Sequence, residues 1–216
     1  ISPDVLVCRS EQELPKDEKN KIALFCSVPA KSVISMHDVD TVYSIPILLN
    51  KQKVDDTILK KLNLKIKKPN LNDWKRVVKA KLLPEKEVNV SFVGKYTELK
   101  DSYKSINEAL EHAGIKNKAK VNINFVEAEN ISSKNIKKTL KNADAVLVPG
   151  GFGERGIEGM ILACKYAREN NIPYLGICLG MQVAIIEYAR NVLNLKGANS
   201  TEFDQNTKHP VIGLIT

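Results

Sequence analysis

The second half of the chain alternates short apolar segments with helix-like segments, and this alternation limits the folds open to it. Strand patterns cover residues 88–93, 121–126, 145–148 and 173–177. Helical periodicity marks residues 102–113, 133–141, 158–170 and 179–193, with Gly114 expected to close the first of these helices. Strands that alternate with helices form parallel sheets, and strands apolar on both faces need cover on both sides. The pattern predicts an α/β fold, a three-layer parallel sheet flanked by helices.

The first part of the chain has a different organisation. We expect a strand at residues 5–8, a helix at 16–26 and short helices at 44–50 and 55–62. Pro69 and Pro84 bracket an amphipathic segment with Trp74 on its apolar face. This predicts one domain over 1–66, an interdomain helix and linker over 67–86, and a second domain over 87–216. The chain opens at Ile1 without a methionine and ends in an apolar run that resembles a strand, so we expect a longer parent.

Composition excludes several classes of function. The net charge is +8, but only five of the 33 basic residues are arginine and the lysines are scattered, so no nucleic-acid partner is predicted. No apolar run approaches the roughly 20 residues that a bilayer span needs, and no signal segment opens the chain. A cytoplasmic protein with no membrane partner is therefore expected. The four cysteines show no C-x-x-C spacing, so neither a zinc site nor a disulfide framework is indicated.

Cys178 lies between Gly176 and Gly180, where an apolar strand runs directly into a helix. This spacing is typical of a nucleophile elbow, a sharp turn whose close backbone packing favours glycine. It places the sulfur at a helix N-terminus, where free N–H groups stabilise negative charge on it. A thiolate there is a competent nucleophile toward an amide carbonyl. The alternative is a small buried cysteine that only fills a strand end.

A second glycine cluster, Pro149 to Gly153, follows the neighbouring strand. Its loop should open at the same carboxyl edge of the sheet as Cys178, which is where ligands bind in open α/β sheets. An N–H group of this loop and the N–H of Leu179 are suitably placed to stabilise an oxyanion formed when the sulfur adds to a carbonyl. By contrast, Cys8, Cys26 and Cys164 have no such setting, and we interpret them as packing residues.

Four segments resemble the class I glutamine amidotransferases, and among them the CTP synthase family in particular. They are residues 147–156 (LVPGGFGERG), 171–182 (NIPYLGICLGMQ), 198–203 (ANSTEF) and 21–26 (KIALFC). The resemblance covers essentially the whole chain. It implies a flavodoxin-like amidotransferase sheet preceded by the C-terminal part of a P-loop-like α/β synthetase domain. In this family the synthetase half uses ATP to phosphorylate UTP, and ammonia released from glutamine then replaces the phosphorylated oxygen to give CTP.

The resemblance also implies roles for individual residues. Cys178 would be the nucleophile and Gly151 a glutamine contact and oxyanion donor. Leu179, Gly180, Met181 and Gln182 would line the glutamine site, and Glu202 would hold the α-amino group of the substrate. A carboxylate suits that ammonium, although without the resemblance Glu202 is simply a solvated loop residue.

The resemblance further implies nucleotide contacts in the first part of the chain. Lys21 would bind the phosphates of UTP or CTP, and His37, Asp38 and Val39 would contact ATP. Position 37 is commonly lysine in the family, so the histidine is a departure. Arg155 resembles the region linked to activation by GTP. Mg²⁺ is implied as a cofactor, with its ligands expected before Ile1 and none in this chain, and the implied assembly is a homotetramer.

Catalysis by a cysteine thiolate needs a histidine and an acid that orients it. His112 lies in a charged helix and His37 in the other domain. His209-Pro210 resembles the first two residues of the family's His-Pro-Glu pair, but Val211 replaces the glutamate, so we interpret His209 as part of a strand. The histidine and glutamate are expected after Thr216, and this chain alone is predicted to be inactive.

Three alternatives stay open from sequence: another class I amidotransferase, a cysteine hydrolase that shares only the elbow, and a catalytically silent binding or assembly module on the same fold.

Overall fold

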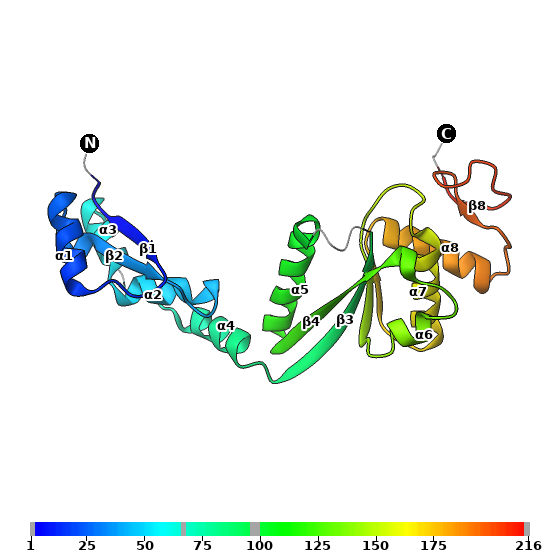
Figure 1. Ribbon diagram of the computed structural model, residues 1–216, viewed down its shortest axis with the longest axis horizontal. Coiled ribbons are helices and arrows are strands. Elements are labelled where there is room, and N and C mark those ends of the chain that lie inside the picture. Colours follow the sequence, from blue (N-terminus) through cyan, green and yellow to red (C-terminus); the bar gives the residue numbers. More distant parts are fainter. Residues whose placement is uncertain (1–2, 66–67, 96–99, 214–216) are drawn as a thin grey trace. The chain divides into compact units, whose positions relative to one another are not determined.

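The computed structural model describes residues 3–65, 68–95 and 100–213. It divides into two compact units, Ile1–Glu85 (unit 1) and Lys86–Thr216 (unit 2), which we describe separately (Figure 1). Unit 2 carries the candidate nucleophile.

The centre of unit 2 is a four-stranded parallel sheet. Its strands are β3 (Lys86–Gly94), β4 (Ala119–Glu127), β5 (Ala145–Val148) and β6 (Tyr174–Gly176). Their order in space is β4-β3-β5-β6, with every neighbouring pair parallel. The strand order reverses between β3 and β5. In open α/β sheets, the carboxyl ends of strands at such a reversal form the usual ligand site.

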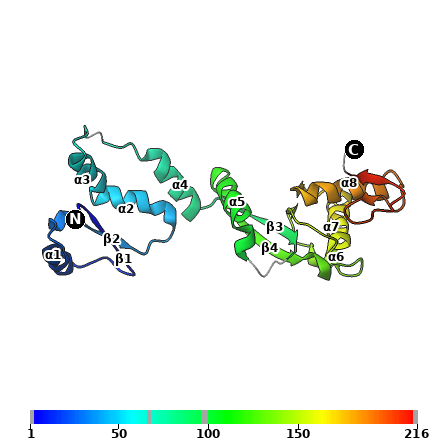
Figure 2. The same ribbon diagram turned by 90° about the horizontal axis from the view of Figure 1, so that it is seen from above.

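Helices cover both faces of this sheet, which gives the three predicted layers (Figures 1 and 2). The helices are α5 (Lys104–Lys116), α6 (Ile136–Thr139), α7 (Ile157–Glu169) and α8 (Leu179–Asn191), with short 3₁₀ turns at Lys100–Tyr103 and Ala128–Asn130. Phe92 and Leu147 face the side of α5, whereas Val93, Val146 and Val148 pack with α7 and α8. Side chains alternate between the faces of a strand, so this split follows from the sequence order.

Two predicted helices differ from the structure. Gly114 does not close α5, because the helix continues to Lys116 and Gly114 is buried inside it. A Cβ atom at position 114 would lie 2.5 Å from the carbonyl oxygen of Ala119, so the glycine allows close packing against the start of β4. The helix expected at 133–141 is reduced to the four residues of α6.

Unit 2 ends in a small two-stranded parallel sheet, β7 (Asn199–Ser200) and β8 (Pro210–Ile212). It begins eight residues after α8, and Val211 and Ile212 pack against the main core. Part of the apolar run expected to be a strand is therefore β8, while residues 214–216 lie outside the described part of the chain.

Unit 1 contains a two-stranded parallel sheet and four helices. The strands are β1 (Leu6–Ser10) and β2 (Val33–His37), and the helices are α1 (Lys16–Phe25), α2 (Ile45–Lys51), α3 (Val54–Lys61) and α4 (Asn72–Leu82). Short 3₁₀ turns cover Ala30–Ser32 and Val42–Ser44. The sequence patterns did not predict β2. Trp74 of α4 packs on Tyr43 and donates its indole N–H to the Tyr43 carbonyl, so α4 belongs to unit 1.

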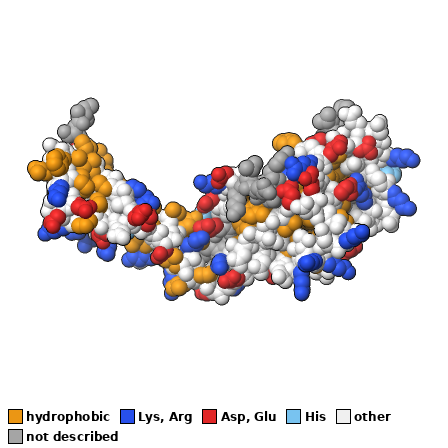
Figure 3. Space-filling view, in the orientation of Figure 1, with side chains coloured by type: hydrophobic (Ala, Val, Ile, Leu, Met, Phe, Trp, Pro, Cys, Tyr) orange, Lys and Arg blue, Asp and Glu red, His pale blue; other side chains and the backbone are white. Residues whose placement is uncertain are grey.

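The core of unit 1 is small, with Ala23, Val28 and Val33 at its centre. Large apolar side chains nearby are solvent-exposed, among them Leu24 at 78% and Phe25 at 86%. Figure 3 shows hydrophobic side chains gathered over α1 and β1. Among the described residues, no helix combines the length and the hydropathy that crossing a membrane would require.

Candidate active site

Cys178 occupies a strained turn between β6 and α8. Its backbone has φ 53° and ψ −105°, a conformation that non-glycine residues rarely adopt, and its side chain is exposed. The turn is closed by hydrogen bonds from Gly180 N to the Ile177 carbonyl at 3.0 Å and from Met181 N to the Cys178 carbonyl at 3.0 Å. Strain of this kind persists only where the surrounding structure enforces it, and such positions cluster at functional sites.

The two flanking glycines explain how the turn is enforced. A Cβ atom at Gly176 would lie 2.4 Å from the backbone carbon of Gly180. A Cβ atom at Gly180 would lie 2.1 Å from the carbonyl oxygen of Val148, at the end of β5. Neither position has room for any side chain. The elbow predicted from the G-x-C-x-G spacing is therefore present, and the packing of backbone on backbone fixes it.

The start of α8 leaves one N–H group without a partner in the helix, directly after Cys178. Leu179 is the first residue of the helix, so its N–H has no partner within the helix, and its side chain is buried. The N–H groups of Met181 and Gln182 both point back to the Cys178 carbonyl. The positive end of the helix dipole therefore lies at the nucleophile, as the sequence predicted.

The glycine loop that follows β5 lies against Cys178. A Cβ atom at Gly150 would be 3.4 Å from Cys178 Cβ and 4.0 Å from its Sγ. A Cβ atom at Gly151 would be 3.3 Å from a methyl carbon of Leu179. The structure thus brings together Cys178, Leu179 and Gly151, the three residues that sequence reasoning placed around the developing oxyanion.

Lys95 holds this loop from the carboxyl end of β3. Its ammonium group donates to the carbonyls of Phe152 at 2.9 Å and Gly153 at 2.6 Å, and the residue is only 3% exposed. Burial lowers the pKa of Lys95, the positive charge of Arg155 lowers it further, and the carboxylates of Glu202 and Glu129 oppose that shift. Sequence reasoning missed this residue, since its only signal was a position directly after a strand.

Two further charged groups fix the surroundings of the loop. Glu202 Oε1 accepts a hydrogen bond from Gly153 N at 3.2 Å, so the loop is tied to the segment after β7. Arg155 pairs with Glu129 at 2.6 Å and lies 3.8 Å from Glu127. The hydrogen bond from Arg155 lowers the pKa of Glu129.

A pocket of about 470 Å³ adjoins Glu202. It is lined by Gln182, Ser200, Thr201, Glu202, Gln205, Ile212 and Gly213. The side-chain carbonyl oxygen of Gln182 is buried and has no hydrogen-bond partner among the described residues. A buried polar atom of this kind is costly unless a ligand or water satisfies it. The pocket therefore offers a carboxylate at Glu202, and it is bordered by Gln182, whose buried oxygen is unpaired.

Met181 and Gly180 do not line this pocket. The Met181 side chain is 54% exposed and lies in a different, apolar groove with Ala184, Ile185 and Tyr188. Gly180 is buried against Val148. Only their backbone groups are placed near the sulfur.

No histidine hydrogen-bonds to Cys178 within the described part of unit 2. His209 was interpreted as part of a strand, but it lies just before β8, in a bend, and only its carbonyl takes part in the pairing, by accepting from Asn199 N at 3.1 Å. His112 lies in α5, 4.0 Å from Glu108.

The remaining cysteines are packing residues, as expected. Cys164 is buried in the main core, where burial and the charge of Glu187 raise its pKa to about 12. Cys8 and Cys26 pack against the core of unit 1.

The comparisons with known proteins follow this geometry. Residues 98–213 match the family described as glutamine amidotransferase class-I, and residues 1–64 match the one described as CTP synthase N-terminus. The chain belongs to the CTP synthase family of class I glutamine amidotransferases.

Individual members of the CTP synthase family are similar to this chain in sequence and structure. A CTP synthase from Caldanaerobacter subterraneus subsp. tengcongensis is 54% identical over 215 residues, which cover 100% of this chain and 40% of that protein. The chain thus spans about two fifths of the length of that curated relative. The structure of the glutaminase domain of Trypanosoma brucei CTPS with bound acivicin is 41% identical, with a TM-score of 0.56, and the match covers 59% of this chain and 50% of that one.

In unit 1, the residues that the CTP synthase resemblance singled out lie on different elements. Lys21 is exposed on α1, whereas His37 ends β2 and Asp38 and Val39 follow it. Asp38 forms an ion pair with Arg9 of β1. Among the described residues, no hydrogen bond or ion pair joins Lys21 to the other three.

Proposed function

We propose that unit 2 is the glutamine-hydrolysing part of a CTP synthase, with Cys178 as its nucleophile. The observation that supports this proposal is the close approach of Gly150 in the glycine loop to the Cys178 turn at the start of α8. The adjoining pocket supports it, because a glutamine substrate carries both an ammonium group for Glu202 and an amide whose N–H suits the Gln182 oxygen.

The first step is addition of the Cys178 sulfur to the side-chain amide carbon of glutamine. The new C–S bond forms as the π electrons move to the carbonyl oxygen, where the N–H groups of Leu179 and Gly151 stabilise the oxyanion. Collapse re-forms the carbonyl, breaks the C–N bond and releases ammonia, which takes up a proton. Water then hydrolyses the thioester to glutamate and restores the thiol.

The proton shuttle must come from elsewhere. Neither His112 nor His209 hydrogen-bonds to Cys178, and we propose that a histidine and an acid outside these 216 residues complete the site. The chain alone is then expected not to turn over glutamine.

We further propose the arrangement that the family resemblance implies for the rest of the chain. Residues 1–66 would form part of the synthetase domain, 67–86 a linking segment and 87–216 part of the amidotransferase domain. Lys21 would bind phosphates of UTP or CTP, and His37, Asp38 and Val39 would contact ATP. Ammonia from unit 2 would aminate UTP that ATP has activated. We also propose a homotetramer in the cytoplasm, where these nucleotides are available.

The family resemblance also implies GTP as an activator and Mg²⁺ as a cofactor. For GTP to bind at Arg155 as an activator, its phosphates would have to compete with Glu129 and Glu127, which already pair with that guanidinium. No group of three His, Cys, Asp or Glu side chains in the described residues is arranged to hold a metal ion. We propose that the protein ligands of Mg²⁺ lie outside these residues, as the family resemblance implies.

The test uses a CTP synthase that carries this sequence. A chloroketone analogue of glutamine should alkylate Cys178, as shown by peptide mass spectrometry, and leave Cys164 unmodified. Cys178→Ser should abolish CTP formation from glutamine but preserve CTP formation from added ammonia. An unreactive Cys178 would favour a silent module, and loss of both activities would contradict the division of roles between the units.

A further inference from the structure

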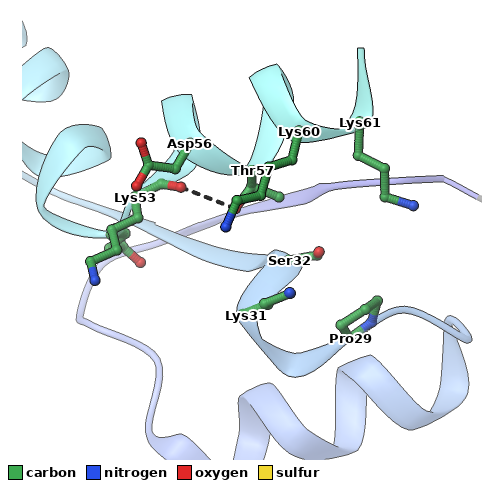
Figure 4. Close-up of a pocket in the computed structure, with 9 residues that line it drawn as sticks. Pro29, Lys31, Ser32, Lys53, Asp56, Thr57, Lys60 and Lys61 are labelled. Carbon is green, nitrogen blue, oxygen red and sulfur yellow. Dashed lines mark hydrogen bonds between the residues drawn. The ribbon is translucent and has the colours of Figure 1, made fainter. Parts of the chain in front are cut away.

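Unit 1 contains a pocket that none of the roles described above uses. It has a volume of about 480 Å³, within the range of small-molecule sites. Its lining comes from the segment before β2 and from the start and end of α3 (Figure 4). The lining residues are Pro29, Lys31, Ser32, Gln52, Lys53, Asp56, Thr57, Lys60 and Lys61.

The pocket has an excess of positive charge. Four lysines line it against one carboxylate, that of Asp56. Lys61 is paired with Asp4 at 2.8 Å, whereas Lys31, Lys53 and Lys60 have no ion-pair partner among the described residues. Like charges gathered around one cavity repel one another, and an anion bound between them would relieve that repulsion.

Ser32 adds a hydroxyl group to the lining of the pocket. The residue is only 1% exposed, but its hydroxyl oxygen is still reached by solvent and makes no hydrogen bond to another described residue. In the view of Figure 4 this hydroxyl lies between the side chains of Lys31 and Lys61. This hydroxyl is therefore available to donate a hydrogen bond to an anion bound among the lysines.

The walls of the pocket are held in place without a ligand. The Gln52 amide nitrogen donates to the Ser35 carbonyl at 2.8 Å, and its oxygen accepts from Ser35 N at 3.0 Å and from Lys19 Nζ at 3.2 Å. Thr57 Oγ1 donates to the Lys53 carbonyl at 3.0 Å. These bonds tie α2 to β2 and close the first turn of α3, so a ligand would not have to order the site.

Lys53 adopts a backbone conformation that favours glycine. It lies between α2 and α3 with φ 57° and ψ 37°, in the left-handed region. A non-glycine residue is strained there, because its Cβ atom lies too close to the following carbonyl oxygen. Lys53→Gly would therefore remove the ammonium group and relieve backbone strain at the same time.

The pocket is distinct from the nucleotide contacts proposed above. Ser32 precedes the amino end of β2, whereas His37 ends that strand and Asp38 and Val39 follow its carboxyl end. None of those three residues, nor Lys21, lines the pocket.

We propose that this pocket binds a small phosphorylated anion through the ammonium groups of Lys31, Lys53 and Lys60 and the hydroxyl of Ser32. Phosphate oxygens accept several charge-assisted hydrogen bonds at once, which matches three mobile ammonium groups and one short donor.

The test is a titration of the 216-residue chain with inorganic pyrophosphate, followed by ¹⁵N NMR. At about 0.15 M salt, where charges farther apart than roughly 8 Å are screened, we expect saturable shifts at Ser32 and Lys53. Lys31→Ala with Lys60→Ala should weaken binding about tenfold or more, since it removes two charge-assisted contacts. Ser32→Ala should weaken it about threefold, as expected for one hydrogen bond.

Two further variants guard against misfolding and nonspecific charge effects. Lys53→Gly should weaken pyrophosphate binding without lowering the melting temperature. The matched control is Lys75→Ala with Lys79→Ala, which removes two exposed charges from α4 of the same unit and should leave binding unchanged. Shifts that never saturate, or an equal loss in the control, would overturn the proposal, as would undiminished binding by Lys53→Gly and Ser32→Ala.

Discussion

The Cys178 turn and the Pro149–Gly153 loop lie at one edge of the sheet but are held by different forces. Backbone packing fixes the turn, because neither Gly176 nor Gly180 has space for a Cβ atom. Charged side chains fix the loop, through Lys95 and Glu202. At Gly153, by contrast, a Cβ atom would meet nothing within 4 Å. One half of the site is thus part of the core, and the other is attached to it.

The supporting groups behind the turn are also uncharged. Tyr174 donates its hydroxyl to the Gly180 carbonyl at 2.8 Å, and Cys164 lies buried next to Tyr174. Substitutions should therefore separate the two halves. Changes at the turn should lower the stability of unit 2, and changes at the loop should lower reactivity while unit 2 stays folded.

The largest expected effect is that of Gly180→Ala. Its Cβ would lie 2.1 Å from the Val148 carbonyl oxygen, and a backbone atom cannot move aside as a side-chain tip can. We expect a loss of about 3 kcal/mol or more of unfolding free energy, at the upper end for overpacking. Urea denaturation followed by circular dichroism measures it. Gly153→Ala is the matched change in the loop, and its cost should be only the roughly 1–2 kcal/mol of a left-handed non-glycine residue. Equal losses of unfolding free energy in the two variants would show that the turn and the loop are held in the same way.

Lys95→Met should lower the reactivity of Cys178 without unfolding unit 2. Methionine fills the same volume but leaves the Phe152 and Gly153 carbonyls without their donor, so the loop N–H groups lose their fixed orientation. In a CTP synthase that carries this sequence, we expect the rate of Cys178 alkylation by a glutamine chloroketone to fall about tenfold. This is less than the roughly 100-fold cost of removing an oxyanion donor, because the N–H groups remain and only their orientation changes.

The control is Lys137→Met, which changes an exposed lysine on α6. In this variant Cys178 should be alkylated at the wild-type rate. A Lys95→Met variant that alkylates normally would show that the loop needs no anchor of this kind. Retained circular dichroism would separate this outcome from unfolding.

Glu202→Gln asks whether Glu202 supports the loop or recognises the substrate. Glutamine retains an oxygen that can accept from Gly153 N but loses the negative charge. We expect KM for glutamine to rise about fivefold, the equivalent of roughly 1 kcal/mol for an exposed charge pair. Alkylation by an electrophile that lacks the α-amino group should not change. A fall in that second rate would assign Glu202 to the loop alone.

The last prediction concerns pH and belongs to the turn. Burial raises the pKa of Cys164 from its ordinary 9.0 to about 12, and burial also raises the pKa of Tyr174. Both groups ionise more readily in the unfolded chain, so the stability that they contribute is complete below pH 9 and declines as pH rises toward 12. Between pH 9 and 11, the unfolding free energy of Cys164→Ala should fall less steeply with pH than that of the wild type. The change in slope should correspond to at most about one proton released on unfolding. Parallel curves for the two proteins would argue against a buried neutral thiol.

The sheet of unit 2 was predictable because its strands are apolar and its helices periodic. The position of β5 was given correctly at both ends, and the elbow followed from two glycines and a cysteine. Local patterns failed where a distant contact decides the structure. Gly114 looks like a helix end, but its contact with Ala119 places it inside α5. Likewise β2 is a strand because β1 pairs with it.

The site shows the same limit. Cys178, Gly151 and Glu202 were found through motifs, since each lies in a distinctive string of residues. Lys95 was missed because nothing near it in sequence distinguishes it from the other lysines. Its role depends on β3 and β5 being neighbours, which brings Lys95 to a loop more than 50 residues away. The lysine pocket of unit 1 is likewise assembled from segments that sequence reasoning did not combine.

The contact between Gly180 and Val148 has a mechanical consequence. The Val148 carbonyl also accepts from Ile177 N at 2.9 Å, and Val148 is the last residue before the glycine loop. The nucleophile and the start of the loop therefore share a single anchor. A displacement of β5 would carry both along together and leave the spacing at Gly150 nearly unchanged. The far side of the loop, from Phe152 onward, is held instead by the side chains of Lys95 and Glu202, so a motion that regulates the site would have to break those side-chain contacts.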